Sequence, residues 1–224
     1  GPWANYAWQV DARTVAAGIG GELAAHGHGE LRGLALEELL LKALQGTVSG
    51  KGRIEWAGAV ATDLDLRWQG LDPSGHFAEW PGRHNGAAML QARWQKGEPE
   101  VWFDAAFLDS RLRGYPFSLQ TQGHTEQGGV HLEEFTARSG ASEVNASGQL
   151  WPSMALDGNL KSTDLRSLWA GPAGAGEAQF GVHGEMDALR FRVLATATMP
   201  RFRQVRARSL ALDANVGFKG HSEL

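Results

Sequence analysis

Histidine and aspartate residues are the first candidates for chemistry in this chain of 224 residues. His26 and His28 would share one face of an extended segment, but the sequence offers no third ligand near them, so we expect no metal site. Asp63 and Asp65 also share a face, where they alternate with leucines. That alternation is typical of exposed carboxylates on a strand rather than of an acid–base pair.

A basic cluster lies near the C-terminus, where Arg201, Arg203, Arg206 and Arg208 alternate with Phe202 and Val205. It could contact anionic lipid headgroups, but a charged outer strand that prevents aggregation between sheets explains it better. The net charge of −4 gives no general reason to bind nucleic acid. The residues therefore predict a protein that is not an enzyme and that uses neither a cofactor nor a metal.

The chain resembles itself at an offset of 96 positions. When Leu23–Ile54 is aligned with Leu119–Leu150, ten of the 32 residue pairs are identical, and Glu37-Glu38 matches Glu133-Glu134. The recurring pair of glutamates favours a turn or bulge specific to the repeat. Internal repetition is typical of an architecture in which each unit packs against its neighbours. We expect two repeat units, spanning about residues 18–115 and 116–224.

Period-two alternation of apolar and polar residues predicts β-strands along most of the chain. The clearest segment runs from Ile54 to Trp68, and a second runs from Ala88 to Trp94. Shorter versions surround Phe191 and Leu212, and glycine- or proline-containing turns separate the segments. Since side chains alternate across a strand, large apolar residues collect on one face. The sequence predicts an all-β protein with an apolar face.

The segment Leu34–Leu44 argues against this prediction, because almost all of its residues are strong helix formers. Its partner in the second repeat, Val130–Gly140, ends in threonine, serine and glycine. If the two copies share one structure, the strand is the better prediction for both.

The absence of cysteine fits an envelope protein that avoids thiols in an oxidising space, but many cytosolic proteins also lack cysteine. The chain has 30 glycines, nine tryptophans, nine phenylalanines and no cysteine, so it forms no disulfide. No run of about 18 apolar residues is present, and we expect neither a transmembrane helix nor a signal peptide within this chain. Gly1-Pro2 is typical of the scar of a cleaved expression tag, so we expect residues 3–224 to form one elongated β segment excised from a larger protein.

Glycine-rich or alternating units recur at Gly46–Trp56, Ala146–Trp151, Lys161–Gly171, Phe180–Phe191 and Ser209–Val216. These segments resemble the TamB and AsmA-like family of large periplasmic proteins. The resemblance rests on glycine-rich and alternating units, covers roughly Gly18 to the C-terminus, and is a texture of repeats rather than one invariant motif.

The resemblance implies a fold and a location. Proteins of this family form a β-taco, an elongated, curled antiparallel or solenoid-like sheet with an apolar concave face. They are anchored in the inner membrane of Gram-negative bacteria, cross the periplasm and work with an outer-membrane partner of the Omp85 type. Their apolar lining is thought to conduct phospholipids or to support outer-membrane protein assembly. The fragment itself could self-associate through open strand edges.

A groove for phospholipid acyl chains needs apolar area rather than positioned donors, which agrees with the shortage of chemical motifs. The lipid-groove candidates are the large apolar residues of the alternating strands: Ile54, Trp56, Val60, Leu64, Leu66, Trp68, Leu90, Trp94, Phe191 and Val193. Two alternatives stay open from the residues alone. One is a structural or adhesive β-solenoid with a closed core, and the other is a polysaccharide hydrolase, for which we find no cluster of carboxylates.

Overall fold

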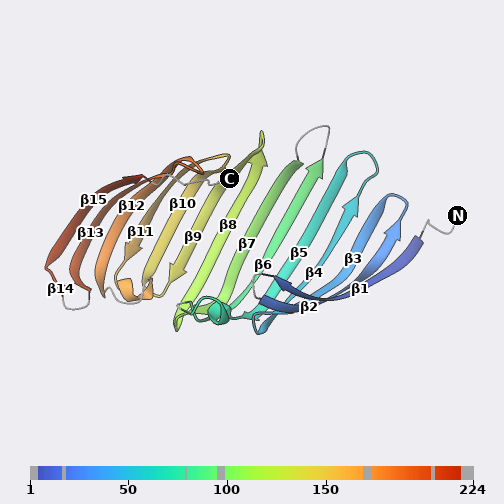
Figure 1. The fold of residues 1–224 in the computed structure, drawn as a ribbon, viewed down its shortest axis with the longest axis horizontal. Helices are drawn as coiled ribbons and strands as arrows, with labels where there is room; N and C mark the ends of the chain where they lie inside the picture. Colours follow the sequence, from blue (N-terminus) through green and yellow to red (C-terminus); the bar gives the residue numbers. More distant parts are fainter. Residues whose placement is uncertain are drawn as a thin grey trace. The chain divides into compact units, whose positions relative to one another are not determined.

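The computed structural model describes residues 5–16, 19–78, 80–94, 99–168, 173–202 and 205–217. The chain divides into two units, Gly1–Gly114 and Tyr115–Leu224. Within the described ranges every regular element is a β-strand except two short 3₁₀ turns, so the prediction of an all-β protein is confirmed (Figure 1).

Unit 1 is an antiparallel sheet in which each strand pairs with the next one along the chain. A 3₁₀ turn, η1 (Pro73–Gly75), connects β5 and β6. The strands are β1 (Asn5–Ala16), β2 (Ile19–Glu30), β3 (Gly33–Ala43), β4 (Gly46–Glu55), β5 (Val60–Leu71), β6 (Gly82–Trp94) and β7 (Pro99–Leu112).

Unit 2 repeats this plan, with a second 3₁₀ turn, η2 (Leu165–Ser167), between β11 and β12. Consecutive strands pair antiparallel as far as β13, which then pairs with both β14 and β15. The strands are β8 (Tyr115–Glu126), β9 (Gly129–Ser139), β10 (Ser142–Trp151), β11 (Ser153–Ser162), β12 (Ala173–Glu185), β13 (Arg190–Phe202), β14 (Val205–Arg206) and β15 (Ser209–Gly217).

The segment of helix formers at Leu34–Leu44 is a strand for most of its length, β3, as expected from its partner in the other repeat. It lies between β2 and β4 and is hydrogen-bonded to both. Pairing on two sides satisfies its backbone groups and packs its leucines, which outweighs a helix propensity of a few tenths of a kcal/mol per residue.

Each glutamate pair forms a β-bulge, which confirms the expectation of a bulge at this motif. Between β3 and β4, Leu36 pairs with Gly52 and Leu39 with Gly50, so that Glu37 and Glu38 together oppose one residue. The pairs Glu37-Glu38 and Glu133-Glu134 interrupt their ladders in the same way. Bulges of this kind bend a strand and increase its twist.

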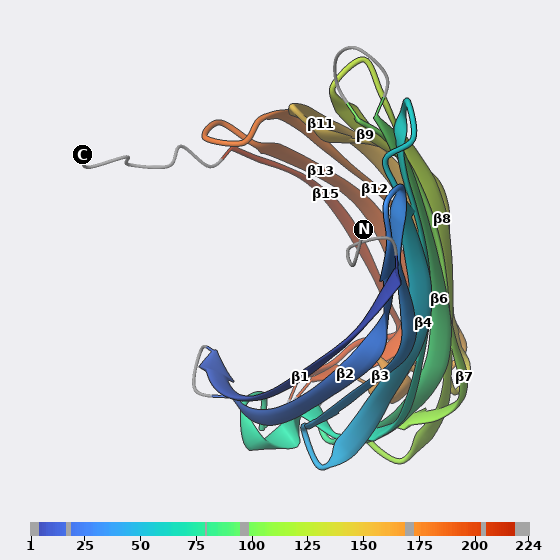
Figure 2. The ribbon, with the colours of Figure 1, turned by 90° about the vertical axis from the view of Figure 1, so that its right-hand side faces the viewer.

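The strands of each unit bend along their length, so each sheet is curled and unclosed (Figure 2). Exposure alternates along β5, where Leu64, Leu66 and Trp68 are half-buried and the residues between them are exposed. A Cβ added at Gly86, on the same face, would collide with the carbonyl oxygen of Ala106 and with the Trp68 ring. Shielding and crowding on this side indicate that the apolar face is the inner, concave one.

Neither unit encloses a conventional core. Among the described hydrophobic residues, the buried ones are Ala25, Ala92, Leu112 and Leu132, and the largest fully buried side chain is that of Ser167. The large aromatic and aliphatic side chains are therefore shielded on one side only. A separate observation is that no described helix has the length and apolar character needed to cross a membrane.

Candidate functional site

Apolar side chains form continuous rows across unit 1, one residue from each strand. One row follows the register from Trp8 on β1 to Phe103 on β7. Its members face the same side because residues paired in adjacent strands share a face. The row consists of Trp8, Gly27, Leu36, Gly52, Leu64, Leu90 and Phe103. We call this side the apolar face of unit 1.

Four of the predicted groove residues, Leu64, Leu66, Trp68 and Leu90, lie half-buried in the middle of this face. Leu64 pairs directly with Leu90. Leu66 lies over Gly50 on the neighbouring strand, since a Cβ there would come within 2.7 Å of a Leu66 methyl carbon. Sequence alternation therefore identified residues that share a face, two of which, Leu64 and Leu90, pair across adjacent strands.

Four others, Ile54, Trp56, Val60 and Trp94, lie where the strands end and are more exposed. Val60 pairs with Trp94, and their exposed fractions are 36% and 45%. Trp56 lies beyond the end of β4, where its indole N–H donates to the Leu31 carbonyl at 3.0 Å. The apolar face thus continues to the strand ends without being covered there.

Glycines make room for aromatic rings on this face. Gly86 on β6 pairs with both Trp68 and Phe107, and the two rings meet above it in an edge-to-face contact with centroids 5.0 Å apart. Trp8 lies over Gly27 in the same manner. Because a ring replaces the missing side chain, the face stays apolar and filled even where the strands carry glycine.

The last two predicted residues, Phe191 and Val193, lie on β13 in unit 2. They pair with Val182 and Phe180 of β12, and on the other side with Val216 and Ala214 of β15. A corresponding row crosses this unit and defines its apolar face: Gly123, Leu132, Gly148, Leu156, Val182, Phe191 and Val216. The ten predicted residues therefore form two sets, one in each unit.

Several members of the apolar face of unit 1 are not among the residues predicted from the sequence. Phe103 and Phe107 alternate correctly on β7, but Trp102 on the opposite face hid the pattern. On β3 the bulge at Glu37-Glu38 changes the parity of the strand, so leucines of both parities share one face. Those leucines are Leu34, Leu36, Leu39 and Leu41.

The polar candidates lie on the opposite side of each sheet. The His28 Nδ1 lies 3.0 Å from a Glu37 carboxylate oxygen, and the His124 Nδ1 lies 2.8 Å from the equivalent oxygen of Glu133. These contacts are solvent-exposed, and the described residues include no group of three or more histidines and carboxylates arranged to hold a metal. Asp63 and Asp65 are exposed, as predicted.

The predicted basic cluster lies largely outside the described residues. Arg203 is not described, nor are the side chains of Arg201 and Arg206, while Arg208 is exposed.

Apolar faces that extend across a whole sheet are uncommon on soluble proteins, and such faces often serve as binding surfaces. Such a face offers extended apolar area and little hydrogen-bonding specificity, which suits a flexible hydrocarbon chain. Each methylene removed from water would contribute roughly 0.8 kcal/mol.

Two comparisons with known proteins bear on the identity of the chain. The family model described as "TamB, N-terminal domain" matches residues 3–222. No solved structure matches the chain.

Proposed function

This chain belongs to the TamB family of envelope proteins, and on that premise we propose that its apolar faces carry phospholipid acyl chains between the two membranes. The observation that carries the proposal is the row of apolar residues and glycines across each unit, in which most of the large side chains are only half-buried. Lipid would slide along these faces, with acyl chains on the concave side and headgroups towards solvent. No catalytic step is involved.

The rows support movement along the sheet because they are continuous from strand to strand. Between Leu64 and Leu90, and again between Leu90 and Phe103, adjacent members are one strand apart, which is about 4.8 Å. A hydrocarbon chain passing from one strand to the next therefore meets an equivalent apolar surface and no large barrier.

Membership of the family supports a proposal for the partners and the location. We propose that the protein works in the periplasm, as part of a polypeptide anchored in the inner membrane, and meets an Omp85-type partner at the outer membrane. In this role it would support outer-membrane biogenesis. Among the described strands, β1 pairs on one side with β2, and β15 on one side with β13. Through these edges we expect the isolated fragment to self-associate.

Photocrosslinking tests the proposal with a matched pair of neighbours on one strand. Leu90 lies on the apolar face, and Met89 lies on the opposite face with 49% exposure. A photoreactive phenylalanine at position 90 is expected to crosslink co-purified phospholipid, whereas the same residue at position 89 is not. Equal crosslinking at both positions, or none at either, would contradict a lipid path along this face.

Charge substitution separates an open face from a closed core. We expect Leu66→Asp to keep the fold while losing crosslinked lipid, because a half-exposed carboxylate can turn towards water. Met89→Asp serves as the control and should change neither. If Leu66→Asp lowers the free energy of unfolding by several kcal/mol, its side chain is sealed from water, and the closed-core solenoid is the better description.

A further inference from the structure

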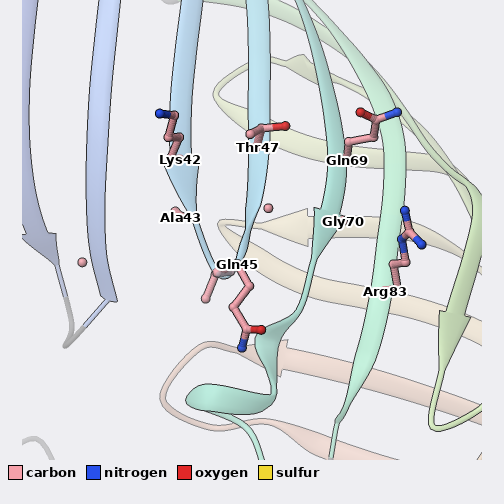
Figure 3. A pocket seen from close by; sticks show the side chains of 10 residues that line it. Lys42, Ala43, Gln45, Thr47, Gln69, Gly70 and Arg83 are labelled. Carbon is pink, nitrogen blue, oxygen red and sulfur yellow. The ribbon is translucent and has the colours of Figure 1, made fainter.

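A hollow lies on the polar side of unit 1, where β3–β6 approach their turns (Figure 3). Lys42, Thr47, Gln69 and Arg83 come from four neighbouring strands, and the β3–β4 turn contributes Gln45. Lys42 pairs directly with Thr47, and Thr47 with Gln69. The volume of the hollow is about 560 Å³, which is enough for an anion of several phosphate groups.

The charges of this hollow are unbalanced. Lys42 and Arg83 are its two cations, and no carboxylate lines it among the described residues. The carboxylate opposite Lys42 on β2 is Glu22, which pairs with Arg13 at 3.3 Å. Within the described part of the chain, neither cation has an ion-pair partner within 4.0 Å. Two cations that share a hollow, and that have no ion-pair partner among the described residues, attract anions.

The corresponding hollow of unit 2 is balanced internally. Arg138 pairs in register with Glu143, as Lys42 does with Thr47, and its Nε donates to the Glu143 carboxylate at 2.7 Å. Lys161, next in the row, lies 3.7 Å from Glu177. Hydrogen bonds from Asn145 and Arg138 lower the pKa of Glu143, which favours its charged form.

We propose that the hollow of unit 1 binds an anion with at least two phosphate-type groups, Lys42 and Arg83 each contacting one group. The two cations stand on strands three apart, or roughly 14 Å at 4.8 Å per strand, so a single phosphate cannot span them. Between them the Thr47 hydroxyl and the Gln69 amide can donate hydrogen bonds to the ligand. This site does not depend on whether the apolar face carries lipid.

Isothermal titration calorimetry at low salt tests the proposal with inorganic tripolyphosphate and orthophosphate. We expect tripolyphosphate to bind more tightly, and its affinity to fall as salt is raised to 0.15 M, where the screening length is about 8 Å. Lys42→Gln should weaken binding at least tenfold. Lys51→Gln removes another cation of the same sheet outside the hollow and should have little effect.

Exchange of charges between the units makes the test sharper. Thr47→Glu introduces the carboxylate of unit 2 and should abolish binding in unit 1, while circular dichroism confirms that the fold is kept. Glu143→Thr combined with Glu177→Gln should create a second site in unit 2. Equal losses in Lys42→Gln and Lys51→Gln, retained binding in Thr47→Glu, or equal affinity for orthophosphate would each overturn the proposal.

Vesicles distinguish the two sources of such a ligand. The variants are compared on phosphatidylcholine vesicles with and without cardiolipin, whose headgroup carries two phosphates. Binding to cardiolipin vesicles that Thr47→Glu removes would identify a lipid headgroup as the ligand. Binding of tripolyphosphate without binding to these vesicles would identify a soluble polyanion. Failure of both probes overturns the site, whereas the crosslinking at position 90 remains a separate measurement.

Discussion

Near η1 and η2, the ends of the strands are packed differently in two otherwise similar sheets. In unit 1 the β3–β4 end carries Ala43 and Gly46, which pair with each other. In unit 2 the β9–β10 end carries Ser139 and Ser142, paired in the same way, with Ser162 next in the row. At these strand ends unit 1 has small residues without polar side chains, whereas unit 2 has buried hydroxyl groups.

The hydroxyl groups of unit 2 form a network beneath η2. Ser142 Oγ donates to Ser162 Oγ at 2.6 Å and shares a hydrogen bond of the same length with Ser167 Oγ. Ser139 Oγ donates to the Ser167 carbonyl at 2.7 Å. All four serines are buried, and each has a partner. The network holds η2 against the sheet, and its hydrogen bonds offset the loss of hydration of the four serine hydroxyl groups.

In unit 1 close backbone approach replaces the network. The last residues of β5 lie directly against Gly46, so that a Cβ there would lie 2.6 Å from the Leu71 amide nitrogen and would also collide with the Gln69 carbonyl oxygen. Leu44 accepts a hydrogen bond from the Asp72 amide at 2.8 Å at this crossing. The same arrangement of strands therefore accommodates either a network of buried hydroxyl groups or a close backbone contact at this end. Each unit has the residues for one of the two arrangements.

The largest effect is expected from moving the serine of unit 2 into unit 1. Gly46→Ser should lower the free energy of unfolding by about 2–3 kcal/mol, because the new Cβ can be accommodated only by moving backbone. Urea unfolding monitored by tryptophan fluorescence measures the change. Gly20→Ala is the control, since a Cβ there meets nothing within 4 Å. If Gly46→Ser is as mild as the control, close approach does not distinguish the units.

A smaller effect is expected from breaking the serine network. Ser142→Ala leaves the hydroxyls of Ser162 and Ser167 without their shared partner in a buried site, and should cost about 1–3 kcal/mol. Ser147→Ala, at an exposed position of the same strand, should stay within about 0.5 kcal/mol. Hydrogen exchange should locate the loss of protection at η2. Unchanged exchange there would show that the network is not what holds the turn.

The smallest effect is an acid sensitivity confined to unit 1. Burial lowers the pKa of His84, and Asp72 raises it by less. Because the folded-state pKa lies below the unfolded value near 6.5, the unfolded chain binds the proton first as the pH falls. This contribution to stability is therefore present above pH 6.5 and is lost as the pH falls towards the folded-state pKa.

Hydrogen exchange at pH 7.5 and 5.5 measures this difference. We expect protection of β6 and η1 to fall more in the wild-type protein than in His84→Gln, which cannot titrate. Unit 2 has no buried histidine among its described residues, so its corresponding segments act as the internal reference. An equal fall in both proteins would assign the acid sensitivity to other groups.

Much of the fold and half of the candidate site could be predicted from local patterns. Alternation along β5 identified Leu64, Leu66 and Trp68 because side chains on a regular strand keep one parity. The same rule failed on β3, since the bulge at Glu37-Glu38 shifts the parity in mid-strand. The same rule could not predict the ring contact between Trp68 on β5 and Phe107 on β7, because strand β6 lies between them.

By itself, the sequence determined the strand content, the apolar face and the family, because these depend on periodicity and on repeated motifs that are local in the chain. The tertiary structure alone decided which residues are covered, since coverage depends on the bend of each sheet and on which neighbours a glycine admits. It also decided the charge balance of the two hollows. Lys42 and Arg138 look alike in sequence, and only the register shows that Thr47 faces one and Glu143 the other.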